Sequence, residues 1–162
     1  METYYFSASQ MTVGYDGKPL IKDITLNVKK GEILTLIGPN GAGKSTILKS
    51  IIGQLSLIAG TVLLDGESIE RMEAAELAKK MSVVLTEQVR TELMTCEDVV
   101  ETGRYPYTGR LGVLSEKDHA VVREAMELTR TTALAKKDFH SVSDGERQRV
   151  MLARAIAQEP EI

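Results

Sequence analysis

The sequence GPNGAGKST at residues 38–46 decides how this chain folds. It matches the pattern G-x-x-x-x-G-K-[ST] of a phosphate-binding loop, the P-loop. The apolar residues 33–37 before it are typical of a buried strand, and residues 47–52 after it are typical of a helix. Because a P-loop lies between a strand and a helix, this context supports the motif.

Each residue type in the loop has a physical reason. Glycines let the backbone wrap a phosphate without Cβ clashes, and the following helix directs its unpaired N–H groups at the same anion. We expect Lys44 to reach the β- and γ-phosphates of a nucleotide, Ser45 to bind Mg²⁺, and Thr46 to lie near the α-phosphate. The alternative, a glycine-rich turn with a solvated lysine, is disfavoured by the specificity of the motif and by its context. The predicted phosphate-binding residues are Gly38, Pro39, Asn40, Gly41, Ala42, Gly43, Lys44, Ser45 and Thr46.

The composition bounds the class of protein. The chain has 162 residues, of which 43% are hydrophobic, and a net charge of −3 without a dense cluster of Lys and Arg. These values favour one domain or a piece of one, and they do not favour a nucleic acid as partner. Cys96 is the only cysteine, so no internal disulfide can form, which suits a cytoplasmic protein. We find neither a secretory signal nor a membrane-spanning apolar run, so we expect membrane association only through a partner protein.

The remaining pattern predicts an α/β fold that begins with strands and ends with helices. The run 62–65 could be taken for a core strand with a metal-binding aspartate, but Asp65 and Gly66 favour a hairpin turn. The predicted elements, in chain order, are strands over 4–28 with a turn at 15–19, the P-loop unit, a strand over 60–66, a helix over 74–80, a second core strand over 82–85, helices over 96–130 interrupted at 105–109, and a helix over 145–158 that Pro160 ends.

Three further features could carry function, and each also has a plainer interpretation. Ser143 and Glu146 form the S-x-x-E pattern of a capping box, although a capped helix N-terminus is also an anion site. Gln88 follows a predicted core strand, where an amide is usually a solvated loop residue. Tyr15 lies in the N-terminal strands, where a lone tyrosine usually serves packing alone.

In their order and spacing, these motifs resemble those of ATP-binding-cassette (ABC) ATPases, and the resemblance covers essentially the whole chain. Residues 142–146 stand where that family has Leu-Ser-Gly-Gly-Gln, its signature motif, with Asp144 in place of a glycine. Residues 13–17 resemble the A-loop, and Gln88 stands at the place of the Q-loop glutamine. Residues 103–109 and 143–149 further resemble ATPases that energise uptake of ferric siderophores, haem or cobalamin.

The resemblance implies ATP and Mg²⁺ as ligands. Tyr15 would stack on adenine, while Ser45 and Gln88 would contact Mg²⁺, and Gln88 would also contact the attacking water. For the nucleotide of a second subunit, the resemblance adds residues at the start of the last helix, namely Ser143, Gly145 and Glu146.

The resemblance also implies the architecture and the partners. The expected fold is an α/β P-loop NTPase core of ABC type with an antiparallel β subdomain and a helical subdomain. We expect the core with its β subdomain over residues 1–90, the helical subdomain over 91–142, and the signature motif with its helix over 143–162. The expected partners are a second ATPase subunit and a membrane permease on the cytoplasmic face, with a substrate-binding protein acting indirectly. A homodimer is the favoured pairing, and a heterodimer is the alternative.

The chain departs from the pattern of the family at the end of the sequence. The chain stops at Ile162, where such proteins begin the Walker B strand, so the aspartate and the catalytic glutamate of that motif have no counterpart here. We therefore expect the complete protein to hydrolyse ATP, and this chain alone to bind nucleotide weakly without turnover. The alternatives are a soluble ABC ATPase, a different P-loop enzyme such as a kinase or GTPase, and a non-hydrolysing nucleotide-binding fragment. The sequence shows no second cassette, which soluble ABC ATPases usually carry. It also shows no guanine-reading N-K-x-D motif, which a GTPase would need.

Overall fold

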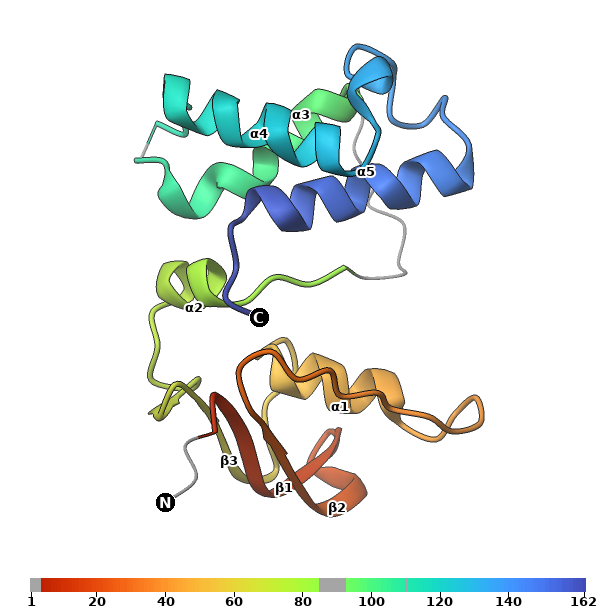
Figure 1. Cartoon of the computed structure of the whole chain (residues 1–162). Helices are drawn as coiled ribbons and strands as arrows, with labels where there is room; N and C mark the ends of the chain where they lie inside the picture. Colours follow the sequence, from red (N-terminus) through yellow and green to blue (C-terminus); the bar gives the residue numbers. More distant parts are fainter. Residues whose placement is uncertain (1–3, 85–92, 110) are drawn as a thin grey trace. The chain divides into compact units, whose positions relative to one another are not determined.

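An antiparallel sheet forms from the strands that the N-terminal pattern predicts. The computed structural model describes residues 4–84, 93–109 and 111–162 of the chain. β1 (Phe6–Tyr15) pairs with β2 (Lys18–Val28) on one side and with β3 (Ala59–Leu64) on the other, and β3 also pairs with β4 (Glu67–Ser68). β1 is therefore a central strand, which explains why most of its side chains are buried (Figure 1).

Two Asp-Gly turns connect these strands. The β1–β2 turn has φ values of 49° at Asp16 and 71° at Gly17, and the β3–β4 turn has 50° at Asp65 and 80° at Gly66. Two consecutive positive φ angles are the mark of a type I′ hairpin turn, which matches the twist of the strands. The prediction of a turn at Asp65, rather than a metal-binding aspartate after a core strand, is confirmed.

The helix predicted after the P-loop is α1 (Lys44–Ile51), and it packs against β1. Its buried side chains are Thr46 and Ser50. Across the sheet the core is apolar, because residues on one face of β1 and β3 alternate into it. The side chains of Met11, Val62 and Leu64 are completely removed from solvent.

The predicted strand over residues 33–37 is absent from the structure. These residues form no regular element, and the side chains of Ile33 and Ile37 are 94% and 90% exposed. The physical reason is that a parallel strand is held by ladder bonds to its neighbours, and among the described residues no strand pairs with this segment. An apolar run without a partner strand stays extended and exposed.

The second core strand, predicted over 82–85, is also not formed over its described residues 82–84. One backbone contact of the kind that a parallel strand makes is present between this segment and Ile162. The Ile162 N–H donates to the Lys80 carbonyl at 3.0 Å, and the Ser82 N–H donates to the Ile162 carbonyl at 3.0 Å. This exchange around Met81 is the hydrogen-bond pattern of one parallel bridge.

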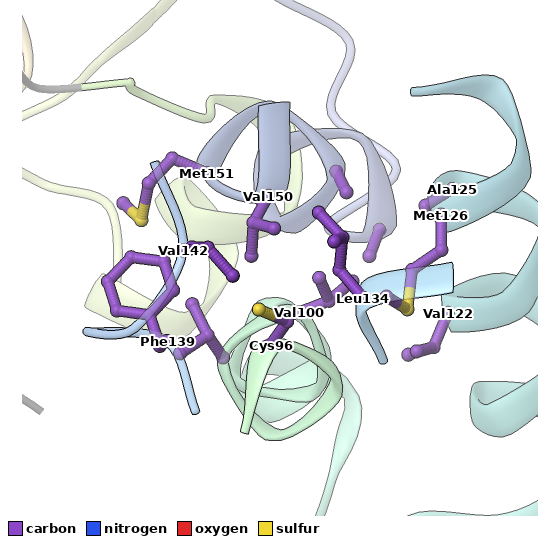
Figure 2. Packing of buried hydrophobic residues seen from close by; sticks show 13 residues of the cluster. Cys96, Val100, Val122, Ala125, Met126, Leu134, Phe139, Val142, Val150 and Met151 are labelled. Atoms are coloured by element: carbon purple, nitrogen blue, oxygen red, sulfur yellow. The ribbon is translucent and has the colours of Figure 1, made fainter. Parts of the chain in front are cut away.

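The second half of the chain is helical, as predicted. Its helices enclose an apolar cluster that includes Cys96, Val100, Met126 and Val150 (Figure 2). Among the described residues, every helix falls short of the length and hydrophobicity needed to cross a bilayer. The elements are α2 (Ala74–Lys80), α3 (Cys96–Glu101), the 3₁₀ helix η1 (Thr102–Tyr107), α4 (Glu116–Leu128), the 3₁₀ helix η2 (Thr132–Leu134) and α5 (Asp144–Ala157).

The chain divides into two compact units, Met1–Glu73 and Ala74–Ile162. The first holds the sheet with α1, and the second holds the remaining helices. The functional division predicted from the sequence, with boundaries at residues 90 and 142, stays a prediction.

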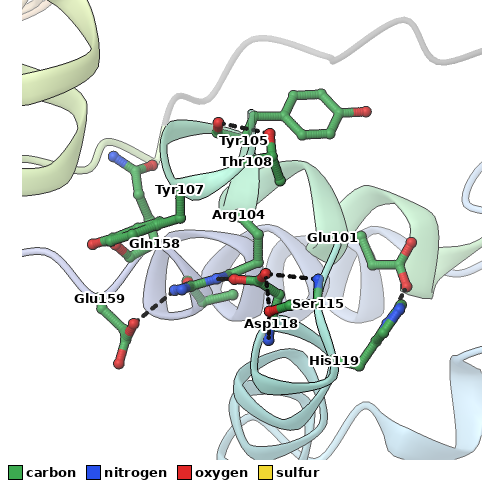
Figure 3. Close-up of polar contacts among 11 residues, drawn as sticks. Glu101, Arg104, Tyr105, Tyr107, Thr108, Ser115, Asp118, His119, Gln158 and Glu159 are labelled. Atoms are coloured by element: carbon green, nitrogen blue, oxygen red, sulfur yellow. Dashed lines mark hydrogen bonds and ion pairs between the residues drawn. The ribbon is translucent and has the colours of Figure 1, made fainter. Parts of the chain in front are cut away.

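Arg104 is the buried charge around which the helical unit is organised. Only 2% of it is exposed. Its Nε donates to Asp118 at 2.9 Å, and its Nη1 donates to the Ala157 carbonyl at 2.7 Å and to Glu159 at 2.8 Å. The Tyr107 ring covers the guanidinium at 4.0 Å (Figure 3). Because a buried charge must be paired, these contacts fix η1 against the start of α4 and the end of α5.

Asp118 also closes the first turn of α4. Its carboxylate accepts from the Ser115 backbone N–H at 2.9 Å and from the Ser115 hydroxyl at 2.6 Å. These two hydrogen bonds, and to a smaller extent Arg104, lower the pKa of Asp118 from 3.8 to about 2. The ionised form of Asp118 is therefore the one that the folded protein favours.

Replacing Asp118 by Asn should flatten the loss of stability in acid. Since the folded-state pKa of about 2 lies below the ordinary value of 3.8, the carboxylate stabilises the fold above that value and loses its contribution as the pH falls toward 2. Relative to the wild type, D118N should unfold at a lower temperature near neutral pH but lose less of its thermal midpoint in acid. Circular dichroism melts across this pH range measure the effect.

The control for D118N is Glu124→Gln, which changes an exposed carboxylate on the same helix. Its midpoint should follow the wild type at every pH. Parallel acid curves for D118N and the wild type would contradict the assigned role of Asp118.

Candidate functional site

Gly43 sets the geometry of the P-loop where the loop joins α1. It is the N-cap residue of α1 and has φ of 88°, in the left-handed region. A Cβ at this position would lie 2.5 Å from Cδ1 of Ile21, which belongs to β2. Only glycine satisfies both conditions, so the sheet and the helix meet closely at this residue.

Lys44 folds back over the loop that precedes it. Its Nζ donates to the Gly38 carbonyl at 2.7 Å and to the Pro39 carbonyl at 2.8 Å. These carbonyls are neutral acceptors, and a phosphate oxygen is a stronger, charged acceptor for an ammonium group. The ammonium is thus held at the loop by the loop's own carbonyls.

The N-terminus of α1 differs from those of α3, α4 and α5 in the second unit. α1 has no side-chain cap hydrogen bond among the described residues, and its first turn carries no acidic residue. In contrast, α3, α4 and α5 each begin with a capping box in which an acidic side chain returns to the N-cap residue. The first N–H groups of α1, and its dipole, therefore remain available to an anion.

Tyr15 lies next to the P-loop. The residue is 52% exposed at the end of β1, while its hydroxyl lies 3.3 Å from Oγ1 of Thr46 on α1. Thr46 itself is only 5% exposed. This hydroxyl contact could not be predicted from the sequence, because the two residues are far apart along the chain and belong to different motifs.

The predicted signature residues form the start of α5. The Ser143 hydroxyl donates to Glu146 at 2.7 Å, and the Ser143 N–H donates to the same carboxylate at 2.9 Å. These two bonds hold the pKa of Glu146 below its usual value. Gly145 is exposed with open space around its Cα, whereas Val142 is buried in the apolar cluster. The capping-box interpretation of Ser143 and Glu146 is confirmed.

The structure groups the predicted site residues by unit. Tyr15 and the P-loop belong to Met1–Glu73, and the signature residues belong to Ala74–Ile162. Gln88 lies outside the described residues. Ser45 is exposed in the first turn of α1, where its hydroxyl is accessible to a metal ion. No group of three or more His, Cys, Asp or Glu residues with metal-binding geometry is found in the described part of the chain.

An open hollow of about 450 Å³ lies in the first unit beside the β1–β2 turn. Its lining comes from this turn and from the loop that follows α1, at residues 54–58. Neither Tyr15 nor any residue of the P-loop lines it. The residues of the candidate phosphate site are therefore separate from this hollow.

Comparison with known proteins agrees with the family resemblance. The family model described as ABC transporter matches residues 21–162. The chain is 46% identical over 152 residues to the uncharacterized ABC transporter ATP-binding protein MJ0873 of Methanocaldococcus jannaschii, covering 94% of this chain and 52% of that protein. It is 35% identical over 156 residues to the iron(3+)-hydroxamate import ATP-binding protein FhuC of Bacillus subtilis, covering 96% and 58%. The chain thus spans about half the length of the curated relatives it matches.

A solved structure shares the fold. The dimeric structure of MJ0796, described as a bacterial ABC transporter cassette, superposes with a TM-score of 0.80 at 26% identity. The superposition covers 96% of this chain and 70% of that one. The α/β cassette fold predicted from the sequence is confirmed, although the strand predicted over 33–37 is not formed here.

Removing the cap of α5 should destabilise the helical unit even without nucleotide. Ser143→Ala deletes the hydroxyl that accepts from the Glu146 N–H, and an N-cap change of this kind costs about 1 kcal/mol. For a chain of this size, that corresponds to a thermal midpoint about 2–4 °C lower. Ser143→Thr keeps a capping hydroxyl and should stay close to the wild type. If S143A melts like the wild type in calorimetry, Ser143 does not cap α5.

Proposed function

The chain belongs to the ABC transporter family, and from this premise we propose that the intact protein is the ATP-binding subunit of a membrane importer. One observation carries the proposal. Lys44 is held over a glycine loop at the start of a helix whose first N–H groups have no side-chain cap among the described residues. Such a helix start binds a phosphate group through its N–H donors and its dipole.

The residues of the first unit fit a nucleotide with its magnesium ion. The backbone of the loop and the start of α1 offer N–H donors, Lys44 offers a positive charge for the β- and γ-phosphates, and Thr46 offers a hydroxyl near the α-phosphate. We propose that the Ser45 hydroxyl holds Mg²⁺, with Gln88 as a second contact to the metal and to the attacking water. Bound Mg²⁺ would neutralise negative charge on the phosphates. The ring of the exposed residue Tyr15 offers a flat surface for adenine.

We infer that the intact protein hydrolyses ATP as a pair of identical subunits. In this arrangement, Ser143, Gly145 and Glu146 of one subunit contact the nucleotide bound by the other. The dimeric structure of the related cassette supports the pairing. We assign no general base among these 162 residues. The pair would dock on a permease at the cytoplasmic face of the membrane, and closing and opening of the pair would drive transport.

The proposed cargo is an iron complex such as a ferric siderophore, with haem and cobalamin as related candidates. Two observations support this class. Residues 103–109 and 143–149 resemble those of the corresponding ATPases, and FhuC of Bacillus subtilis is named for iron(3+)-hydroxamate import. A substrate-binding protein would deliver the cargo to the permease.

Lys44→Ala should weaken the binding of Mg·ATP by about 10- to 100-fold, because a hydrogen bond to a charged group contributes about 1.5–3 kcal/mol. Isothermal titration calorimetry on the intact protein measures the affinity. Lys22→Ala removes an equal charge from an exposed position on β2 and should bind like the wild type. Unchanged affinity in K44A, or no binding by the wild type, would overturn the proposed nucleotide site.

Deleting the gene for the intact protein should abolish energised uptake of one cargo in cells that otherwise transport it. The measurement compares uptake of a radiolabelled ferric hydroxamate, haem and cobalamin, and a plasmid carrying the wild-type gene should restore the one that is lost. Unchanged uptake of all three would exclude this class of cargo while leaving the nucleotide site untouched.

A further inference from the structure

We propose that Tyr15 acts on the phosphates of the nucleotide as well as on its base, through a hydrogen bond from its hydroxyl to Thr46. The inference rests on the proposed nucleotide site, and it assigns Tyr15 a second role as a positioning residue. Its starting point is the distance of 3.3 Å between the Tyr15 hydroxyl and Oγ1 of Thr46.

The two side chains differ in their surroundings. Tyr15 as a residue is 52% exposed, but its hydroxyl end lies at the first turn of α1. Thr46 is 5% exposed, and its hydroxyl therefore has few water molecules as alternative partners. The hydrogen bond links the last residue of β1 with the last residue of the P-loop.

A threonine hydroxyl has one proton to donate and two lone pairs that accept. When the phenol of Tyr15 donates to Oγ1, the proton of Thr46 is left free for another acceptor. The phenol is also the more acidic of the two hydroxyls, which favours this direction. An oxygen of the bound α-phosphate would be the acceptor for Thr46, and a charged acceptor strengthens the whole chain of bonds.

The contact also fixes the orientation of Tyr15. The hydrogen bond favours ring orientations that keep the hydroxyl near Thr46, and the type I′ turn at Asp16 and Gly17 follows Tyr15 in the backbone. The surface proposed for adenine and the hydroxyl proposed for the α-phosphate are thus set by one hydrogen bond. A ligand that has phosphates but no base should therefore still depend on the Tyr15 hydroxyl.

The test uses Mg·tripolyphosphate, a ligand with the phosphates of ATP and no adenosine. In the intact protein, Tyr15→Phe keeps the aromatic ring and removes only the hydroxyl. We expect Y15F to bind Mg·tripolyphosphate about threefold to tenfold more weakly than the wild type, the range that one neutral hydrogen bond accounts for. Thr46→Val should weaken it at least as much. The double variant should bind no more weakly than T46V alone, because both changes break the same chain of bonds.

A matched control is Tyr105→Phe, which removes a phenol hydroxyl from an exposed tyrosine in the second unit and should leave the affinity unchanged. Wild-type affinity for Mg·tripolyphosphate in Y15F, or additive effects of the two changes, would overturn the inference. The inference would also be overturned if the wild type bound Mg·ATP but not Mg·tripolyphosphate, because the phosphate contacts alone would then not suffice for binding. If the wild type binds neither ligand, the proposed nucleotide site itself fails.

Discussion

The N–H groups that open an α-helix must find acceptors, and this constraint separates the helices of the chain into two classes. α3, α4 and α5 carry their own acceptors, a hydroxyl at the N-cap and a carboxylate three residues later. α1 begins at a left-handed glycine, with no side-chain cap among the described residues, and a lysine stands at its first position. A carboxylate in its first turn would have occupied the place proposed for a ligand anion. The proposed phosphate site thus uses a helix start without a side-chain cap, whereas α3, α4 and α5 close theirs with a capping box.

In the helical unit, the buried cation Arg104 connects several elements through its hydrogen bonds. Arg104 is satisfied by a carboxylate at the start of α4, by the last carbonyl of α5 and by Glu159. A cation near the C-terminus of α5 is favoured by the helix dipole, and the paired carboxylates offset part of the cost of burying the charge. The Tyr107 hydroxyl adds a bond to the Gln158 carbonyl at 2.9 Å. These contacts anchor α5 at the end opposite to Ser143, which caps its N-terminus.

Much of the fold could be predicted from the sequence because it depends on local patterns. The Asp-Gly turns, the helix after the P-loop and the capping box of Ser143 each follow from residues a few positions apart. The strand predicted over 33–37 failed because an apolar run becomes a strand only beside a partner, and none pairs with it among the described residues. The structural role of Arg104 could not be predicted, because nothing in a sequence shows that a charged side chain is only 2% exposed.

Contacts between residues distant in the sequence also explain how the candidate phosphate-binding loop holds its shape here without a strand before it. The contacts that fix the loop come from the antiparallel sheet. Ile21 of β2 packs where a side chain at residue 43 would lie, and Tyr15 of β1 reaches the Thr46 hydroxyl. Lys44 supplies the third constraint from within the loop, through carbonyls five and six residues before it. Two strand residues and one lysine therefore determine the position of the loop relative to the sheet, while the exposed segment at 33–37 contributes no comparable contact among the described residues. This arrangement makes β1 and β2, which carry no phosphate-binding motif of their own, the scaffold of the candidate site.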